Sequence, residues 1–157
     1  MSLLTDVKIA CLGSGIMGGL LVKRLVNANA VPASNIICSD TLDEKLASLE
    51  AFGIQTTLQN TGAAAQADII IIAVPPPAVM PVLSEIAPVI GPGTLIISVA
   101  AGLTLAKMRS VVPAGAHLAR MMPNTPSEVG EGMNTFVCEP GMPQEQHAIF
   151  SSLLNVW

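Results

Sequence analysis

The sequence predicts a doubly wound α/β fold, in which helices cover both faces of a mostly parallel sheet. Three observations support this prediction. Short apolar runs, typical of strands buried on both faces, alternate along the whole chain with segments of helical periodicity. The alternating units show no internal repeat, and a glycine-rich turn joins the first apolar run to the first helical segment. We therefore expect a single sheet whose parallel strands are linked by right-handed crossovers.

The expected strands are short and mostly apolar. The first ends in a glycine, and the most strand-like segment is an isoleucine-rich run that three consecutive prolines terminate. The last run, which contains Phe136, is the shortest of the series. In chain order, the expected strands are residues 7–12, 35–39, 54–57, 69–74, 94–99, 116–121 and 136–138.

The expected helices follow these strands. The first has apolar residues at a helical period and ends before Pro32, and the second has acidic residues in its first turn and Gly53 just past its end. A proline opens the last helix. The expected helices are residues 16–29, 43–51, 61–67, 79–87, 105–111 and 143–154.

The composition excludes several classes of protein. A length of 157 residues predicts one domain. The net charge of −4, without a cluster of lysines or arginines, argues against a nucleic-acid partner. The chain is 51% hydrophobic and only 11% charged, but its longest apolar runs, residues 69–74 and 95–106, are far shorter than the ~18 residues of a membrane span. We therefore expect no membrane partner.

Cysteine and histidine usage points to a reducing compartment without a metal site. Cys11, Cys38 and Cys138 are scattered and fit no metal-ligand spacing, so we expect them to be small buried hydrophobes and expect no metal. His117 and His147 are expected on a strand and on a helix surface, not in catalysis. The N-terminal segment MSLLTDVK lacks the features of a signal peptide, which predicts a cytoplasmic location.

A GxGxxG motif stands between the first strand and the first helix. Its first glycine permits a tight turn, its second lets the backbone approach a pyrophosphate, and its third lets helix and strand pack closely. The helix N-terminus adds oriented N–H groups. A packing motif without a ligand is the alternative, but the strand before and the helix after favour dinucleotide binding by Gly13, Ser14, Gly15, Ile16, Met17 and Gly18.

Asp40 ends the second strand about 20 residues after the motif, the distance at which an acidic residue binds the adenosine ribose hydroxyls of NAD. The alternative is that Asp40 caps the helix that begins in the segment TLDEKL. No arginine follows Asp40 to neutralise the 2′-phosphate of NADP. This local chemistry favours NADH.

With the segments ADIIIIAV, SVAAG, MPNTP and GEGM added to the glycine motif, the chain resembles the N-terminal domain of the pyrroline-5-carboxylate reductases over its whole length. The resemblance implies a Rossmann domain and hydride transfer from NAD(P)H to the cyclic imine 1-pyrroline-5-carboxylate, giving L-proline. It also implies a helical dimerisation domain that these 157 residues do not include, and a full-length protein that forms homo-oligomers.

The resemblance also implies roles for individual residues. Catalytic groups stay unknown, but Met122, Pro123, Asn124 and Thr125 are candidates for the substrate side of the site. A rigid proline turn is the alternative for this segment. Beyond the glycine motif and Asp40, the residues expected at the dinucleotide are Asn60, Ala73, Val74, Pro75, Ala100, Ala101 and Gly102.

Two departures from the family pattern concern charge. The family often has a lysine in the segment AVKP, where this chain has Pro75, and often has an arginine after the second strand, where this chain has Thr41. Both departures remove positive charge from the adenosine side and favour NADH over NADPH.

Two other functions remain open at this point. The chain could be a dinucleotide-binding or regulatory module without catalysis, or a 3-hydroxyacid-type dehydrogenase domain. The second group usually places an acidic-serine motif where this chain has SVAAG, which argues against it.

Overall fold

The computed structural model describes residues 3–157. Residues 1 and 2, at the start of the segment considered for a signal peptide, lie outside this range. The seven strands form one sheet in the order β3-β2-β1-β4-β5-β6-β7. All pairings are parallel except that of β7 with β6. The strands are β1 (Ile9–Leu12), β2 (Ile36–Ser39), β3 (Gln55–Thr57), β4 (Ile69–Ile72), β5 (Leu95–Ser98), β6 (His117–Met122) and β7 (Thr135–Cys138).

The described part of the chain has six α-helices, of which the first five connect consecutive strands and the sixth follows β7, and their positions agree closely with the sequence pattern. They are α1 (Ile16–Asn27), α2 (Asp43–Glu50), α3 (Asn60–Ala64), α4 (Pro76–Ile86), α5 (Leu105–Arg109) and α6 (Gln144–Leu154). Three short 3-10 turns accompany them, namely η1 (Ala33–Asn35), η2 (Ala87–Val89) and η3 (Thr125–Val129).

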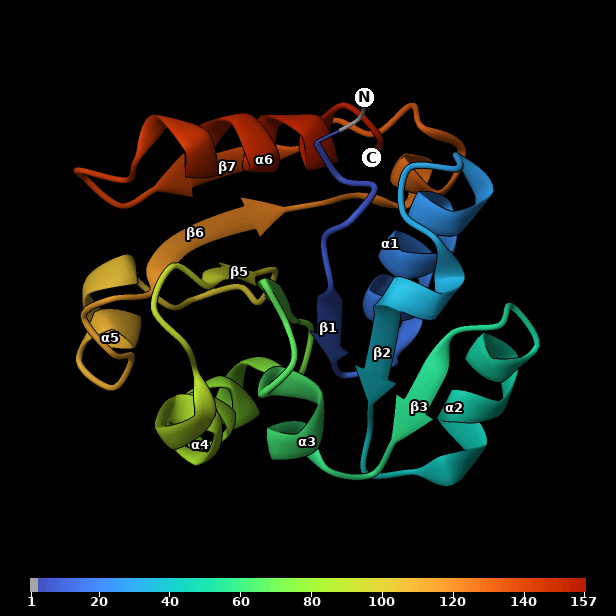
Figure 1. Ribbon diagram of the computed structural model, residues 1–157, viewed down its shortest axis with the longest axis horizontal. Helices are drawn as coiled ribbons and strands as arrows, with labels where there is room; N and C mark the ends of the chain where they lie inside the picture. The colour runs from blue at the N-terminus through green and yellow to red at the C-terminus, as the bar shows by residue number, and fades with distance from the viewer. Residues whose placement is uncertain (1–2) are drawn as a thin grey trace.

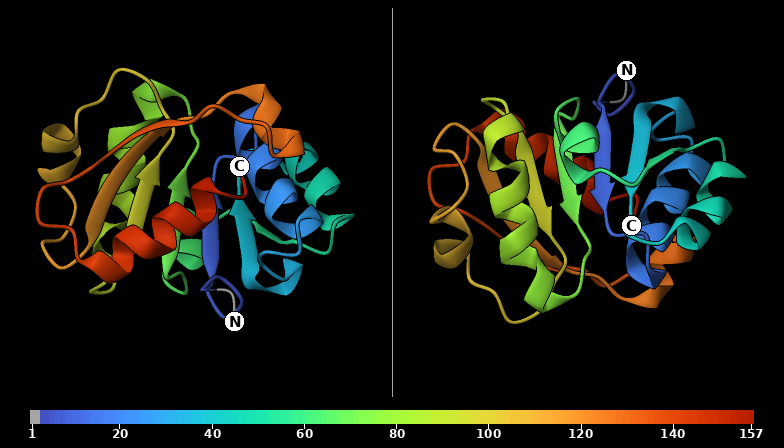
Figure 2. Two further views of the ribbon diagram at one scale, coloured as in Figure 1. Left: turned by 90° about the horizontal axis from the view of Figure 1, so that it is seen from above. Right: turned by 90° about the horizontal axis from the view of Figure 1, so that it is seen from below.

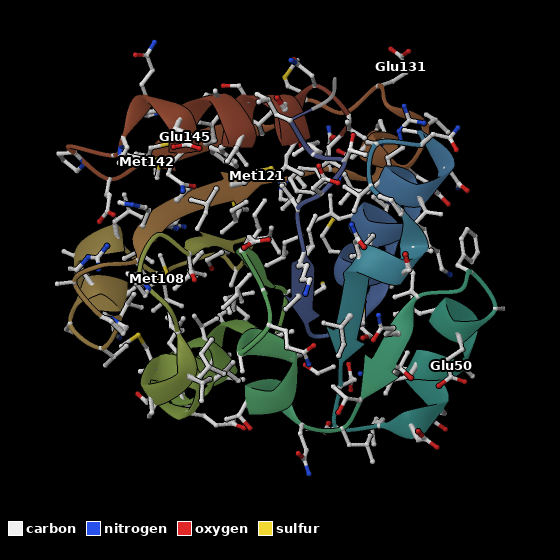
Figure 3. The ribbon with its side chains drawn as sticks, viewed as in Figure 1. Glu50, Met108, Met121, Glu131, Met142 and Glu145 are labelled. Atoms are coloured by element: carbon white, nitrogen blue, oxygen red, sulfur yellow. The ribbon has the colours of Figure 1, made fainter. Side chains whose placement is uncertain are left out.

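Two helical layers enclose the sheet (Figures 1 and 2). Apolar residues of α1, α2 and α6 pack on one face, and those of α3, α4 and α5 pack on the other. Met121 and Met142 belong to the first core, whereas Met108 of α5 belongs to the second (Figure 3). Because both faces are covered, the central strands β1 and β4 are buried along their whole length. The predicted doubly wound fold is therefore confirmed.

Most element bounds differ from the sequence prediction by one to three residues. Helix α4 begins at Pro76 instead of residue 79, because a proline lacks an N–H that the first turn of a helix would leave unused anyway. The segment after β6, for which no helical turn was expected, contains the 3-10 turn η3, which packs against α1.

The chain terminus is fastened to α1. The indole Nε1 of Trp157 donates a hydrogen bond of 3.1 Å to the carbonyl oxygen of Leu21, and the side chain of Trp157 is buried. Arg24 donates from Nε to the carbonyl oxygen of Val156 at 2.9 Å. The helix that follows the glycine motif is thus held by both the sheet and the end of the chain. None of the helices formed by residues 3–157 has the length and apolar character needed to cross a membrane.

Candidate functional site

The glycine motif forms a tight turn at the carboxyl end of β1. Gly13 has a φ of +99°, which favours glycine, and its N–H donates to the carbonyl oxygen of Ser39 at 2.8 Å. A Cβ at Gly13 would lie 2.6 Å from the carbonyl carbon of Ala73, so a side chain would collide with the backbone after β4. A Cβ at Gly18 would collide with the carbonyl oxygen of Gly13. The first glycine is therefore required by the tight turn and the third by close packing, as predicted.

The second glycine differs from its neighbours. Gly15 has an ordinary φ of −68° and is the N-cap of α1, and a Cβ there would meet no protein atom within 4 Å. Neither backbone conformation nor protein packing explains why this position lacks a side chain. The space beside it is open, and it lies at the helix N-terminus, where N–H groups attract an anion.

Gly15 faces a cavity of about 590 Å³ at the carboxyl edge of the sheet. The cavity lies where the strand order reverses, because β1 connects to β2 on one side and is paired with β4 on the other. Open α/β sheets bind ligands at this kind of switch point, and 300–1,000 Å³ is the usual size of a ligand pocket. The lining residues are Gly13, Gly15, Met17, Asp40, Thr41, Lys45, Asn60, Ala73, Val74, Pro75, Pro76, Ala78, Val82, Val99, Ala100 and Ala101.

Asp40 is fixed at one end of the cavity. Its Oδ2 accepts a hydrogen bond of 2.8 Å from the backbone N–H of Ser14, and its Oδ1 accepts one of 3.1 Å from the N–H of Leu42. Leu42 itself occupies the N-cap position of α2, without a side-chain cap. The alternative that Asp40 caps this helix is therefore wrong. Asp40 instead ties the glycine turn to the loop after β2.

A chain of hydrogen bonds supports the floor of the cavity beside Asp40. Ser39 donates from Oγ to Oδ1 of Asn60 at 2.7 Å, and Asn60 donates from Nδ2 to Oε2 of Glu85 at 3.0 Å. Ser14 donates from Oγ to the carbonyl oxygen of Ser39 at 3.2 Å. Asn60 is thus held in one orientation, with its amide at the cavity wall.

Most residues predicted at the dinucleotide do line one cavity. The structure places ten of them there: Gly13, Gly15, Met17, Asp40, Asn60, Ala73, Val74, Pro75, Ala100 and Ala101. Four predicted residues do not line it. Ser14 and Ile16 border a neighbouring hollow on the α2 side of α1, Gly18 packs beneath the turn, and Gly102 is exposed.

The candidates for the substrate side lie outside this cavity. Met122, Asn124 and Thr125 are exposed, Pro123 is half-buried, and none of the four lines the 590 Å³ space. Asn124 has a contact within its own loop, because its Oδ1 accepts a hydrogen bond of 3.0 Å from the N–H of Met133. A rigid proline turn, the alternative for this segment, would not by itself require an amide side chain. The hydrogen bond from Met133 gives the amide of Asn124 a role within the loop.

Six lining residues were not among the predicted ones: Thr41, Lys45, Pro76, Ala78, Val82 and Val99. Lys45 matters most, because its Nζ lies 4.0 Å from Oδ1 of Asp40. No arginine follows Asp40 in the sequence, but the structure places this lysine beside it. The signal in the sequence was the position of Lys45 in the first turn of the helix that follows Asp40, which brings its side chain back toward the end of β2.

The remaining candidates behave as structural residues. His117 lies on β6 with Nδ1 3.8 Å from Oε1 of Glu139, and His147 is exposed on α6, as predicted. All three cysteines are free. Cys11 and Cys38 are buried as expected, but Cys138 is only partly buried. Within residues 3–157, no group of three or more histidine, cysteine or acidic side chains could hold a metal ion.

Comparisons with known proteins agree with this architecture. The chain is 33% identical over 149 residues to a pyrroline-5-carboxylate reductase of Vibrio alginolyticus, which covers 94% of this chain and 54% of the relative. The structure of a pyrroline-5-carboxylate reductase from Coxiella burnetii superposes with a TM-score of 0.90 at 25% identity, covering 97% of this chain and 57% of that one.

A second solved structure contains a bound cofactor. The crystal structure of Plasmodium falciparum pyrroline carboxylate reductase with NADP bound has a TM-score of 0.84 at 25% identity, and covers 98% of this chain and 56% of that one. The chain thus spans about half the length of the curated relatives it matches. These similarities confirm the resemblance found from the motifs.

A family model described as NADP oxidoreductase coenzyme F420-dependent matches residues 8–102. The match starts just before β1 and ends just after the cavity residues that follow β5, so it contains the glycine turn and every residue that lines the cavity. Since it spans more than half of the 157 residues, the chain belongs to this oxidoreductase family.

Proposed function

We propose that this chain is the dinucleotide-binding part of a pyrroline-5-carboxylate reductase and that it takes NADPH or NADH. The open space beside Gly15 is the observation that carries the proposal. Gly15 lies at a helix N-terminus and at the switch point of the sheet, and neither its φ nor protein packing requires a glycine there. A glycine at this position lets a pyrophosphate approach the backbone N–H groups closely.

The cofactor, when bound, would supply the hydride that adds to the carbon of the protonated C=N bond of 1-pyrroline-5-carboxylate, giving L-proline and the oxidised cofactor. The residues of this chain have other tasks. The turn at Gly13 and Gly15 binds the pyrophosphate, and Asp40 and Asn60 hold the adenosine end. Val99, Ala100 and Ala101 form the wall after β5 that borders the nicotinamide. The side chains of this wall are apolar, so they present no polar group to the nicotinamide.

We place the imine between this wall and the segment that contains Met122, Asn124 and Thr125, as the similarity to the reductases implies. In the part of the chain that the structure describes, these side chains are exposed, so the substrate side of the site is open to water. The 157-residue chain is therefore expected to bind cofactor well but to reduce the imine slowly, because an open site neither orients the substrate nor excludes water.

The glycine turn provides the test of cofactor binding. Gly15→Val is expected to abolish binding of NADPH and NADH in calorimetric titrations, because the branched side chain would fill the space assigned to the pyrophosphate. The fold should persist, since a Cβ at this position meets no protein atom within 4 Å. Gly62→Ala in α3 is the matched control, because its Cβ would make only ordinary contacts with Gln59. Unchanged affinity in a folded Gly15→Val variant would show that the turn is only a packing device.

The substrate is tested by following NADPH oxidation with 1-pyrroline-5-carboxylate, and in parallel with a 3-hydroxyacid and NAD. Slow, saturable oxidation that depends on the imine and yields L-proline supports the proposal. Turnover of the hydroxyacid would identify a dehydrogenase domain instead. Tight cofactor binding with neither reaction, even when the second half of a relative is supplied, would identify a binding module.

We further propose a cytoplasmic, homo-oligomeric protein. The three cysteines form no disulfide in the structure, which supports the location. Exposed apolar side chains at Met122, Phe136 and Val137, around β7, support a covering subunit. Sedimentation of the full-length protein measures the second point, and a purely monomeric protein would contradict it.

A further inference from the structure

We propose that Lys45 is the cofactor-specificity residue of this site: it neutralises Asp40 when NADH is bound and pairs with the 2′-phosphate when NADPH is bound. The inference rests on the proposed function, because it concerns the adenosine end of the same cavity. Its consequence is a domain that accepts both cofactors, in place of the NADH preference predicted from the sequence.

Asp40 is preorganised as a charged acceptor. Two backbone N–H groups, of Ser14 and Leu42, occupy one lone pair on each of its oxygens, and its side chain is only 9% exposed. A carboxylate has further acceptor capacity, so Asp40 can still accept from a ribose hydroxyl. Its fixed negative charge would repel a 2′-phosphate unless a cation lies close by.

Lys45 is that cation. It is the one basic side chain among the residues that line the cavity, and its Nζ lies 4.0 Å from Oδ1 of Asp40. That separation is too long for a hydrogen bond, and 47% of the side chain is exposed. An ammonium group on a flexible four-carbon stem can therefore turn from Asp40 to a phosphate without breaking a hydrogen bond.

The other nearby charges do not provide this function. Lys23 borders the neighbouring hollow, but its Nζ is hydrogen-bonded to Oγ of Ser48 at 3.3 Å and lies 5.1 Å from the ring centre of Phe52. Glu44 and Glu128 border the same hollow and carry the wrong charge for a phosphate partner. Thr41, which lines the cavity after Asp40, can add a hydroxyl but no charge.

The chemistry predicts a difference between the two cofactors that a binding experiment can measure. With Lys45 present, the 2′-phosphate of NADPH meets one carboxylate and one ammonium group. Without it, the phosphate meets the carboxylate alone. NADH lacks the phosphate and depends on Lys45 only indirectly, through the charge of Asp40.

The test is a set of calorimetric titrations of NADPH and NADH into the wild-type chain, Lys45→Gln and the control Lys23→Gln, each at low and high salt. We expect Lys45→Gln to lower the affinity for NADPH by about 10-fold, equivalent to about 1.4 kcal/mol, and the affinity for NADH by no more than about 3-fold. Lys23→Gln should change neither affinity by more than about 2-fold. High salt should lower the affinity for NADPH more than the affinity for NADH in the wild-type chain, and this difference should be smaller in Lys45→Gln.

Several outcomes would overturn the inference. Equal losses of affinity for both cofactors would show that Lys45 only neutralises Asp40. An unchanged affinity for NADPH would show that groups other than Lys45 bind the 2′-phosphate. A wild-type preference for NADH that Lys45→Gln does not alter would restore the prediction made from the sequence. A wild-type chain that binds neither cofactor would refute the proposed function itself, which is a different result from any of these.

Discussion

Single residues at this site have purposes that their identity alone does not reveal. Asn124, between two prolines, has the features of a ligand group in the sequence, yet its amide oxygen accepts a hydrogen bond from the backbone of Met133. Asp40 was expected to bind a ribose or cap a helix, and it holds the N–H of Ser14 in the glycine turn. A polar side chain near a site can therefore shape the loop that presents other groups.

Cys11 illustrates how surroundings determine the chemistry of a side chain. It lies opposite Cys38 on the neighbouring parallel strand, and both are buried. A hydrogen bond with Cys38, together with burial, raises the pKa of the Cys11 thiol. Burial, and to a lesser extent Glu139, also raises the pKa of Cys138, but that thiol is partly accessible.

We predict that a thiol reagent at pH 8 modifies only Cys138 in the folded chain, because Cys11 and Cys38 are buried and inaccessible to the reagent. The reaction should be slow, because the reactive species is the thiolate and the pKa of Cys138 is raised. Mass spectrometry after labelling, with and without denaturant, gives the count. All three cysteines should react in denaturant. Rapid modification of Cys11 in the folded chain would show that the region beneath the glycine turn opens to solvent.

The roles of residues could be predicted from the sequence where they depend only on the conformation of the local backbone. Gly13 and Gly18 follow from the geometry of a strand that turns directly into a helix, and spacing alone revealed them. Lys45 was missed because its role depends on how far a side chain extends from α2 toward β2. The positions of residues 122–125 depend on a loop whose conformation is set by contacts with α1 and with Met133.

At the scale of elements, β7 differs from its neighbours. It is antiparallel to β6, at the edge of the sheet, and three of its four residues are exposed. Glu139, directly after β7, accepts hydrogen bonds from Nη2 of Arg109 at 2.6 Å and from the N–H of Leu118 at 3.0 Å. One carboxylate thus joins α5, β6 and β7.

We predict that Glu139→Ala lowers the free energy of unfolding by about 1–3 kcal/mol, because it removes the anionic partner of Arg109 and leaves the N–H of Leu118 without its acceptor. Arg109 would keep its hydrogen bonds to the carbonyl oxygens of Pro113 and Ala116. The estimate lies below the cost for a fully buried pair because Arg109 is 31% exposed. Urea denaturation measures the change. Glu131→Ala is the control, because this side chain points into solvent (Figure 3), and it should change stability by less than about 0.5 kcal/mol. Equal effects of the two substitutions would show that the cluster does not stabilise β7.

The elements themselves were largely predictable. Strands buried on both faces appear as continuous apolar runs such as residues 69–72, which no exposed segment would tolerate. The direction of β7 could not be predicted, because a strand of four residues has the same pattern in either orientation. The start of α4 was placed late because Pro76 and Pro77 were interpreted as the end of a strand rather than the start of a helix.

At the scale of the molecule, the order of the strands creates the site. The loops after β1 and β4 separate at the switch point, and the cavity lies between them, with the loop after β5 as a third wall. The segments that line the cavity are far apart in sequence. Local sequence patterns could therefore predict that these segments meet only because the patterns also predicted the fold class. This is why the fold and the glycine turn were predicted together, whereas the full set of lining residues required the structure.

The location of the bound cofactor tests the central proposal most directly, and titration of the isotopically labelled chain with NADPH, followed by amide nuclear magnetic resonance, measures it. We predict saturable shifts concentrated at the backbone amides of Gly13, Gly15, Val74, Ala100 and Ala101, which line the cavity. Shifts should be small at β7, at the edge of the sheet beyond β6, and at α6, none of whose residues lines the cavity. An absence of shifts at the glycine turn, or shifts confined to β7, would contradict the assignment of this cavity as the dinucleotide site.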